Sequence, residues 1–310
     1  MDVTLRQLRY FAAVAERLSF TRAAEGLHVS QPALSVQIRQ LEQSLGVPLV
    51  RRTSRSVELT AAGRALHEDL AAVFADLERA LGRARAARAG SRPRVAYTAS
   101  VAYEALPVIL DHLEGAGLAD VDARMRWCAQ AADDVRTGAA DLALVREFDG
   151  APGLRSEVIR REPLAAFAAV GHALAGRPAV AIDDLRGHTI LVVSEELAPG
   201  FHALPGRLCA RRGFAAQVDV LTAQESREPL LAHLRRHPEH LFLGPASSGS
   251  LAWEGVVAVP VEGPDAHITL CLVTPERGAS DTGARAAAEV RIAAERAGWG
   301  DGTPAVLGGA

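Results

Sequence analysis

The side chains of this chain best suited to chemistry are amide, hydroxyl and guanidinium groups gathered between positions 21 and 55. Gln31, Ser35 and Arg39 recur every four residues, a spacing that places side chains on one face of a helix. A run of three arginines and three hydroxyl residues follows: Arg51, Arg52, Thr53, Ser54, Arg55 and Ser56. Amides and guanidiniums match the hydrogen-bonding edges of bases, and guanidiniums with hydroxyls match phosphates. This chemistry is hydrogen bonding to a nucleic acid.

Two short helices and a turn would position the first of these groups. A helix beginning near Thr21 would bury Ala23, Ala24 and Leu27, and a turn from Gly26 to Val29 would follow. Ser30 is a good N-cap, and Pro32 falls in the first helical turn, where its missing N–H costs nothing. The second helix then carries an apolar face, composed of Leu34, Ile38, Leu41 and Leu45. Its opposite face would expose Gln31, Ser35, Val36 and Arg39 to a major groove.

The arginine and hydroxyl run predicts a wing after the second helix. It follows Gly46-Val47-Pro48-Leu49 and returns through Val57-Glu58-Leu59, in the manner of a hairpin. A helix, a turn, a second helix and a basic wing in this order favour a DNA-binding head over an ordinary amphipathic helix pair. The predicted DNA-contacting set is Thr21, Arg22, Ser30, Gln31, Pro32, Ser35, Arg39, Arg52, Ser54 and Arg55.

Charge divides the chain in the same place. Residues 1–90 carry thirteen Arg against nine acidic residues, whereas the remainder carries twenty-one against twenty-eight, and all 34 Lys and Arg are Arg. The resulting net charges are +4 and −7, which sum to the chain's −3. Only the basic N-terminal part is therefore expected to meet nucleic acid.

A long uninterrupted helix is predicted between Thr60 and Gly90. Its apolar residues recur at nearly heptad spacing: Leu66, Leu70, Val73, Leu77 and Leu81. At about 28 residues, such a helix would be roughly 40 Å long. It could pack on its own domain, but so narrow a seam favours an intermolecular coiled coil that joins two DNA-reading heads.

Beyond Arg94 the pattern alternates between strands and helices. The expected strands are 94–98, 121–127, 141–146, 164–170, 190–194, 217–221, 241–244 and 268–274, and the expected helices are 104–115, 133–137, one ending at 212, 225–236 and 284–297. Such alternation predicts mostly parallel sheets with helices on both faces, and this length favours two α/β lobes. The predicted segments are a head (1–60), a linker helix (61–90) and a C-terminal domain (91–310), with lobe I at about 91–164 and 266–300 and lobe II at about 165–265.

The first 65 or so residues closely resemble LysR-type transcriptional regulators. The matching residues are Leu5-Arg6-Gln7-Leu8-Arg9-Tyr10-Phe11, Ala23-Ala24, Ser30-Gln31-Pro32-Ala33-Leu34-Ser35, Ile38, Leu41-Glu42, Leu45-Gly46 and Leu59-Thr60-Ala61-Ala62-Gly63. The resemblance implies a dimeric or tetrameric bacterial regulator with a C-terminal, periplasmic-binding-protein-like effector domain. It also places the two lobe crossings near 162–168 and 262–268. Val36 departs from the family's usual basic residue, and Val50-Arg51-Arg52 departs from its usual aromatic entry to the wing.

Ligands of parallel sheets bind beyond the carboxyl ends of strands, at helix N-termini. The predicted effector-binding set is therefore Thr98, Ser100, Val101, Arg146, Ser194, Phe201, Thr222 and Ser247. Small hydroxyls beside free N–H groups would suit an anionic effector such as a carboxylate, and Arg146 would supply a charge partner or a hinge contact. Thr98 and Ser100 could equally be N-caps, and Phe201 could be core. The bulky, charged run from Leu234 to His240 departs from the small, glycine-rich segment common in the family.

Other chemistry is sparse in this sequence. Cys128, Cys209 and Cys271 are far apart, which favours inert thiols over a redox pair, and His237 and His240 lack a ligand set of metal-binding spacing. Neither a phosphate loop nor a catalytic triad is recognisable, so we expect no cofactor, no metal and no catalysis. Without a signal segment or a membrane-spanning stretch, a cytoplasmic protein is expected. Two alternatives remain open: a DNA-binding protein whose C-terminal domain only oligomerises, and a solute-binding or enzymatic protein whose N-terminal helices only mediate dimerisation.

Overall fold

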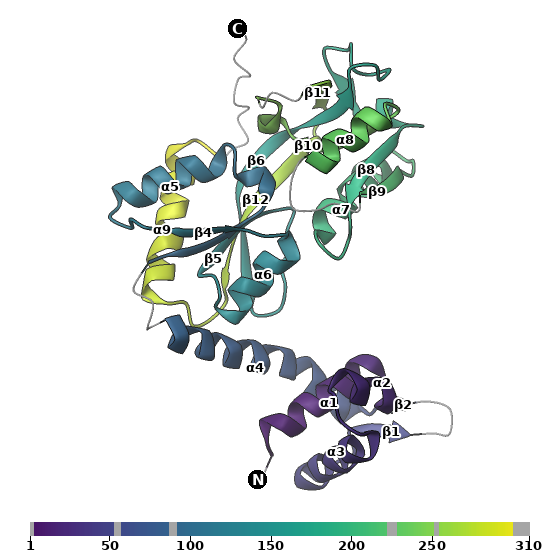
Figure 1. Ribbon diagram of the computed structural model, residues 1–310, viewed down its shortest axis with the longest axis vertical. Coiled ribbons are helices and arrows are strands. Elements are labelled where there is room, and N and C mark those ends of the chain that lie inside the picture. Colours follow the sequence, from purple (N-terminus) through teal and green to yellow (C-terminus); the bar gives the residue numbers. More distant parts are fainter. Residues whose placement is uncertain (1–2, 53–56, 87–91, 222–227, 251–253, 300–310) are drawn as a thin grey trace. The chain divides into compact units, whose positions relative to one another are not determined.

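The computed structural model describes residues 3–52, 57–86, 92–221, 228–250 and 254–299. The chain divides into two compact units, residues 1–77 and 78–310, and the helix α4 (Ala61–Ala86) contains the boundary between them (Figure 1). We call them the N-terminal unit and the C-terminal unit. None of the helices in these described ranges is both long and apolar enough to cross a membrane.

Three helices form the N-terminal unit: α1 (Leu5–Arg17), α2 (Phe20–Gly26) and α3 (Gln31–Leu45). Each begins at a hydroxyl N-cap, where Thr4, Ser19 and Ser30 accept hydrogen bonds from backbone N–H groups of the first turn. Ser30 and the early proline were both predicted, and both predictions are confirmed. The predicted apolar face of α3 is also confirmed, since Leu34, Ile38 and Leu41 are fully buried and Leu45 packs beside them.

A two-stranded wing follows α3. Strands β1 (Val50–Arg52) and β2 (Val57–Leu59) pair antiparallel, with Val50 opposite Leu59. Glu42 anchors the entry to the wing, because its Oε1 accepts hydrogen bonds from the N–H groups of Leu49 and Val50 at 2.8 and 3.0 Å. A Cβ added to Gly63 would lie 2.1 Å from the carbonyl oxygen of Leu49, so only glycine permits α4 to pack this closely.

The helix α4 does not carry one continuous exposed seam. Leu70 is 3% exposed and belongs to the core of the N-terminal unit, where Leu66 and Phe74 also pack. The prediction that Leu70 forms an intermolecular contact is therefore wrong, since this part of the helix closes its own unit. Leu66 is only half-buried, and its predicted contact stays a prediction. Val73 and Leu81 are 46% and 40% exposed, and Leu77 is half-buried.

The C-terminal unit contains a mixed sheet of ten strands. The main path runs β4-β3-β5-β12-β6-β10-β8-β9, and β11 and β7 join it through β6. The strands are β3 (Arg94–Tyr97), β4 (Asp122–Met125), β5 (Leu142–Arg146), β6 (Leu154–Ala169), β7 (Val180–Ala181), β8 (Thr189–Val193), β9 (Gln217–Leu221), β10 (His240–Pro245), β11 (Val256–Glu262) and β12 (His267–Pro275). The helices are α5 (Ala105–Gly115), α6 (Cys128–Thr137), α7 (Pro199–Ala210), α8 (Glu228–Arg236) and α9 (Asp281–Arg296), with short 3₁₀ turns η1 (Ala99–Val101), η2 (Ile182–Leu185) and η3 (Ala246–Ser250).

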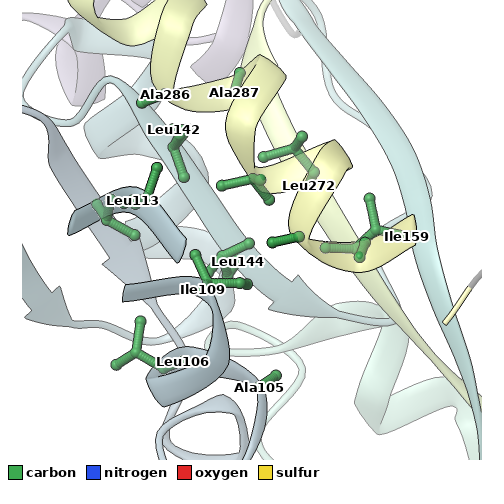
Figure 2. Packing of buried hydrophobic residues seen from close by; sticks show 14 of the residues in the cluster. Ala105, Leu106, Ile109, Leu113, Leu142, Leu144, Ile159, Leu272, Ala286 and Ala287 are labelled. Carbon is green, nitrogen blue, oxygen red and sulfur yellow. The ribbon is translucent and has the colours of Figure 1, made fainter. Parts of the chain in front are cut away.

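Lobe I is the part of this sheet from β4 to β12 with its helices. Helices α5 and α9 cover one face, where Ile109 and Leu113 of α5 meet Leu142 and Leu144 of β5 (Figure 2). Helix α6 covers the other face, where Ala131 and Val135 pack near Val145 and Val273. Successive β5 residues point to opposite faces, so every one of them is buried.

Lobe II repeats this layering around β8, β9, β10 and β11. Helix α7 packs on one face through Leu204 and Leu208, and α8 packs on the other through Leu230, Leu231 and Leu234. Strand β6 continues from one lobe into the other: it pairs with β12 up to Pro163 and with β10 from Leu164. The two-lobed α/β class is therefore confirmed.

Strand β6 is also where the sequence expectation was least accurate. Only residues 164–170 were predicted as a strand, whereas β6 has 16 residues, and β11 was not predicted at all. Five of the nine strand pairings in the described part of this sheet are parallel, in line with the expectation of mostly parallel sheets. The four antiparallel pairings all involve β6 or β12, whose antiparallel course was not expected. The part of β6 before Leu164 contains several charged residues, among them Arg160 and Glu162, which are buried in ion pairs. Charged residues at buried positions break the alternation of apolar and polar residues by which a strand is recognised in a sequence.

Candidate functional site

The outer face of α3 is polar and solvent-exposed. Gln31, Pro32 and Arg39 are exposed, and Val36, which shares this face, is 40% exposed. Arg39 is held loosely, through a 3.4 Å hydrogen bond from its Nε to the carbonyl oxygen of Ser35. A rigid core behind the helix and free side chains in front of it are what a groove-reading helix requires.

Ser35 does not belong to this face, contrary to prediction. Its side chain is 7% exposed, within the row formed by Leu34, Ile38 and Leu41. The physical reason is the width of the buried stripe: on a helix packed against two others, it spans more than 100° and includes positions adjacent to the leucines. A small hydroxyl fits there, so the expected outward orientation of Ser35 is wrong.

The remaining predicted DNA contacts lie on α2, at its junction with α3, and in the wing. Thr21 and Arg22 are exposed on α2, and Arg22 donates a 2.8 Å hydrogen bond from Nη2 to the carbonyl oxygen of Arg17. Ser30 is exposed, but its hydroxyl is engaged as the cap of α3. The side chain of Arg52, and the whole of Ser54 and Arg55, lie outside the described residues.

In the C-terminal unit, charged groups gather where β5, β6 and η3 meet. Arg146, at the end of β5, is 3% exposed and donates a 2.7 Å hydrogen bond from Nη1 to Oε2 of Glu162, which is 2% exposed. The other carboxylate oxygen of Glu162 accepts the Ser247 N–H at 3.0 Å. Burial acts to raise the pKa of Glu162, but Arg146, the hydrogen bond from Ser247 and Arg160 outweigh it, so the pKa lies below its ordinary value. Arg146 was predicted as a charge partner or hinge contact, and the pair lies where β6 passes from its pairing with β12 to its pairing with β10.

Arg160 extends the same cluster toward lobe I. Its Nη2 donates to Oε1 of Glu104 at 3.0 Å, and its guanidinium carbon lies 5.0 Å from the centroid of the Trp299 ring. The arrangement combines an ion pair with a cation–π contact. Sequence reasoning missed Glu104, Arg160 and Glu162, because no local pattern connects positions that are this far apart.

Glu147 is a second buried carboxylate that the sequence did not reveal. Its Oε1 accepts hydrogen bonds from the N–H and hydroxyl of Thr269 at 2.6 and 2.9 Å, and its Oε2 accepts one from Arg207 of α7. Its φ of +50° is in the left-handed region, which is uncommon for a residue with a side chain. Gly200 of α7 packs directly on it, since a Cβ there would lie 1.7 Å from the Glu147 carbonyl oxygen. Glu147 thus joins the end of β5 to β12 and to α7.

The predicted effector-binding residues occupy different environments. Thr98 follows β3, beside the end of β5, and its buried Oγ1 has no hydrogen-bond partner. Ser100 and Ser194 are half-buried, whereas Phe201 packs between lobe cores and lies 5.6 Å from Phe242. The side chain of Val101 is fully buried in the core of lobe I, and its N–H donates to the carbonyl oxygen of Thr98 at 2.9 Å. Thr222 lies outside the described residues.

Among the predicted effector-binding residues, Thr98 gives the clearest indication of a ligand, because its buried hydroxyl has no hydrogen-bond partner. A buried hydroxyl without a partner costs roughly 1–3 kcal/mol, a penalty that a ligand acceptor or donor would remove. The predicted alternative, in which Thr98 caps the following turn, is not observed: η1 has no side-chain cap hydrogen bond from Thr98. The Nε of Arg146, at the end of the neighbouring strand, is another buried group with no partner.

The three cysteines are buried and free. Burial, with a smaller contribution from Cys271, raises the pKa of Cys128 to about 12. Burial also raises the pKa of Cys209. Thiols with raised pKa values hold their protons at neutral pH and are poor nucleophiles.

Comparison with known proteins accounts for both units. Residues 5–64 match the family described as "Bacterial regulatory helix-turn-helix protein, lysR family", and residues 86–293 match "LysR substrate binding domain". The chain belongs to the LysR family. It is therefore a DNA-binding transcriptional regulator with an effector-binding domain, and the resemblance found in the sequence is confirmed.

Individual regulators are similar to this chain over 63–94% of its length. The HTH-type transcriptional regulator BudR of Raoultella terrigena is 34% identical over 231 residues, which cover 72% of this chain and 78% of BudR. The Hca operon transcriptional activator HcaR of Escherichia coli is 37% identical over 204 residues, or 63% of this chain and 68% of HcaR. Among solved structures, the LysR family regulator CbnR is 26% identical, with a TM-score of 0.57 over 94% of this chain and 99% of CbnR. CbnR complexed with its target DNA matches at 27% identity and a TM-score of 0.55, over 94% of this chain and all of that one.

Proposed function

We propose that this regulator binds DNA as a dimer or tetramer, with two α3 helices entering successive major grooves. The observation that carries the proposal is the exposed face of α3, where Gln31, Val36 and Arg39 stand opposite a fully buried row of Leu34, Ile38 and Leu41. Gln31 and Pro32 would lie near base edges, and Arg39 would reach a base or a phosphate. The wing residues Arg52, Ser54 and Arg55 would hold the backbone.

The oligomer would use the part of α4 that its own unit leaves exposed. Val73 and Leu81 are apolar, exposed and eight residues apart, which places them about 80° apart around the helix axis, within one broad face. A second α4 would cover both, with the half-buried Leu77 between them. Two heads joined in this way would read two half-sites.

The effector would bind beyond the carboxyl ends of β3 and β5. The unpartnered hydroxyl of Thr98 supports this position, with Ser100 beside it and Ser194 and Phe201 contributing from lobe II. The N–H groups and hydroxyls of this region favour an anionic ligand such as a carboxylate. The guanidinium of Arg146 is already paired with Glu162, so the ligand charge would meet hydroxyl and N–H groups more than a free cation.

Binding would act by changing the relative orientation of the lobes. The lobes share β6 and are joined by buried charge contacts at Glu162 and Glu147. A ligand that prefers one arrangement of these contacts shifts the population toward it, and with it the spacing or bend imposed on DNA.

The first test is selection of bound fragments from the source genome, repeated at two salt concentrations. We expect an imperfect inverted repeat whose half-sites lie one or two helical turns apart. Recovery of no specific sequence, even at low salt, would contradict the proposed mode of binding. A thermal-shift screen of small anions then tests the effector site, because a ligand of the folded state raises the melting temperature in a concentration-dependent way.

Single substitutions separate the two kinds of DNA contact. Arg55→Ala should weaken binding to all sequences and reduce the salt dependence by about one unit of slope. Gln31→Ala should change the preferred base at one position while leaving the salt slope intact. An unchanged slope for Arg55→Ala would mean that the wing does not contact phosphates.

A further inference from the structure

Lobe II contains a group of histidines and acids that the proposed regulation does not use. His233 of α8 and His240 of β10 approach with Nε2 and Nδ1 3.0 Å apart, and the carboxylate of Asp219 in β9 lies beside both. We propose that Asp219, His233 and His240 form a binding site for a divalent metal ion of the Zn²⁺ class. The site lies on α8, β9 and β10, which carry none of the DNA-contacting or effector-binding residues named above.

The geometry of the three ligand atoms fits one ion. Oδ2 of Asp219 lies 3.7 Å from Nε2 of His233 and 3.8 Å from Nδ1 of His240, and the two nitrogens are 3.0 Å apart. The radius of the circle through three points is the product of the sides divided by four times the triangle's area. For these separations it is about 2 Å, the length of a Zn–N or Zn–O bond. An ion close to the plane of the three atoms would therefore bind them all, and a shift of a few tenths of an ångström in the side chains would bring them to the separation of about 3.3 Å found in tetrahedral sites.

The fold holds these three groups in place. Asp219 and His240 lie on β9 and β10, on either side of β8, and Leu191 of β8 packs against α8. Leu230 and Leu234 of α8 are buried on this face, and His233 is half-buried one position before Leu234. The N–H of Val220 donates to Oδ1 of Asp219 at 2.9 Å, which leaves Oδ2 for the histidines. A metal site is prearranged when its ligands lie on rigid elements and the second oxygen of its carboxylate is already held by a hydrogen bond.

Surrounding groups complete the environment of a metal site. Oε1 of Glu239 lies 3.7 Å from Nε2 of His240, the ring nitrogen that faces away from the other two ligands. Carboxylates beside the non-ligating nitrogen orient metal-bound histidines and strengthen them as ligands. The His237 ring stacks 4.5 Å from that of His233, so it borders the site as well. Asp219 is 48% exposed, which gives an ion access from solvent.

Two imidazoles and one carboxylate determine the class of ion. Nitrogen ligands select borderline transition metals over Ca²⁺ and Mg²⁺, which bind oxygen. Three protein ligands leave a fourth position for water. The sequence expectation of no metal considered only His237 and His240, because Asp219 is 21 residues from His240 along the chain and joins it only through the sheet.

Zinc titration of the full chain tests the site. The protein is produced without a polyhistidine tag, dialysed against a chelator, and titrated with Zn²⁺ in competition with a chromophoric chelator. We expect one tight site, and Co²⁺ in its place should give the intense visible bands of a tetrahedral complex. His233→Gln and Asp219→Asn should each weaken binding by at least about 100-fold, and Glu239→Gln by about 10- to 100-fold.

Matched substitutions guard against misfolding and nonspecific binding. His112→Gln removes another histidine with a carboxylate neighbour, Glu289, and should leave Zn²⁺ affinity unchanged. Glu254→Gln, a neutralisation of an exposed acid, is the control for Glu239→Gln. Asp219→Asn preserves size at a half-exposed position, so its metal-free urea midpoint should equal that of the wild type. Wild-type affinity in both Asp219→Asn and His233→Gln would overturn the proposal and leave a hydrogen-bonded histidine cluster.

Discussion

The two units present their polar groups in opposite ways. The N-terminal unit keeps Gln31 and Arg39 exposed on a helix whose opposite face is fully buried. The C-terminal unit buries its charges instead: Arg146, Glu147, Arg160 and Glu162 are all less than a tenth exposed. Within α3 the groups that matter are a few residues apart, whereas the buried charged groups of the C-terminal unit find their partners across the sheet.

 

Glu147, for example, accepts hydrogen bonds from Thr269, which is 122 positions further along the chain.

This difference predicts different consequences of substitution. An exposed polar side chain contributes little to the free energy of unfolding, so its replacement should affect binding alone. A buried charge is stable only with its partner, so its replacement should destabilise the unit before any effect on regulation is seen. The three tryptophans, Trp127, Trp253 and Trp299, all belong to residues 78–310, so their fluorescence reports the unfolding of the C-terminal unit alone.

The largest expected effect is that of Glu162→Gln. The substitution leaves the buried Arg146 guanidinium without its charge partner, and the free energy of unfolding should fall by about 3–5 kcal/mol. Urea unfolding followed by tryptophan fluorescence measures this change. Glu157→Gln is the control, because Glu157 and Arg291 form a half-exposed pair 2.7 Å apart that should contribute at most about 1 kcal/mol. Equal effects in the two variants would remove the contrast between buried and exposed charge.

The pH dependence of unfolding sharpens the same test. The pKa of Glu162 is lowered in the folded state, so the charged carboxylate stabilises the fold above its unfolded pKa of about 4.3. This stabilisation is lost as the pH falls through the lower, folded pKa. The wild type should therefore lose stability on acidification below about pH 4.3, and Glu162→Gln should lose less over the same interval. Parallel profiles for the two proteins would contradict the assigned role of Glu162.

Gly200→Ala should have the next largest effect. The new methyl group would collide with the Glu147 carbonyl oxygen where α7 packs on the end of β5, at a cost of about 1–3 kcal/mol. Gly206→Ala is a matched control in the same helix, since a Cβ there meets no atom within 4 Å. In a helix interior this control should be neutral or stabilising by up to about 1 kcal/mol. Tryptophan-monitored urea midpoints compare the two, and equal midpoints would mean that α7 does not depend on this close approach.

Gln31→Ala should alter DNA binding and leave stability almost unchanged. We expect the affinity for the selected site to fall by about 1–3 kcal/mol, measured by fluorescence anisotropy, and the melting temperature to change little. Gln43→Ala makes the same change at an exposed position in the last turn of α3 and should retain full affinity. A large loss of stability in Gln31→Ala would place this residue among the buried ones and break the contrast between the units.

Thr98→Val is the one substitution here that should weaken binding of the effector without destabilising the fold. Valine has nearly the same shape and removes a buried hydroxyl that has no partner, so the free energy of unfolding should not fall and can rise by up to about 1–3 kcal/mol. The ligand-induced rise in melting temperature should nevertheless be reduced, because the valine cannot hydrogen-bond to the effector. Ser156→Ala is a control, since its hydroxyl already donates to the carbonyl oxygen of Phe148 at 3.0 Å. A full thermal shift in Thr98→Val would exclude Thr98 from the effector site.

Sequence reasoning predicted the N-terminal unit more completely than the C-terminal one. The cap at Ser30, the early Pro32 and the buried row from Leu34 to Leu41 all follow from local patterns, and all are observed. The error at Ser35 arose because a period alone does not show how wide the buried stripe is. In α4, the near-heptad pattern of Leu66 and Leu70 did not reveal which surface covers them, since packing within a unit and packing between chains demand the same side chains.

The amino-acid sequence by itself determined the family, the order of the elements in the N-terminal unit, and the polar face of α3 around Gln31 and Arg39. These features depend on residues within one or two helical turns, where spacing and capping act directly on the backbone. Only the tertiary structure decided the partners of Glu147 and Glu162, the position of Leu70, and the approach of Asp219 to His233 and His240. These contacts join strands and helices that are distant in the chain, and the sheet register and packing that bring them together are a property of the whole fold.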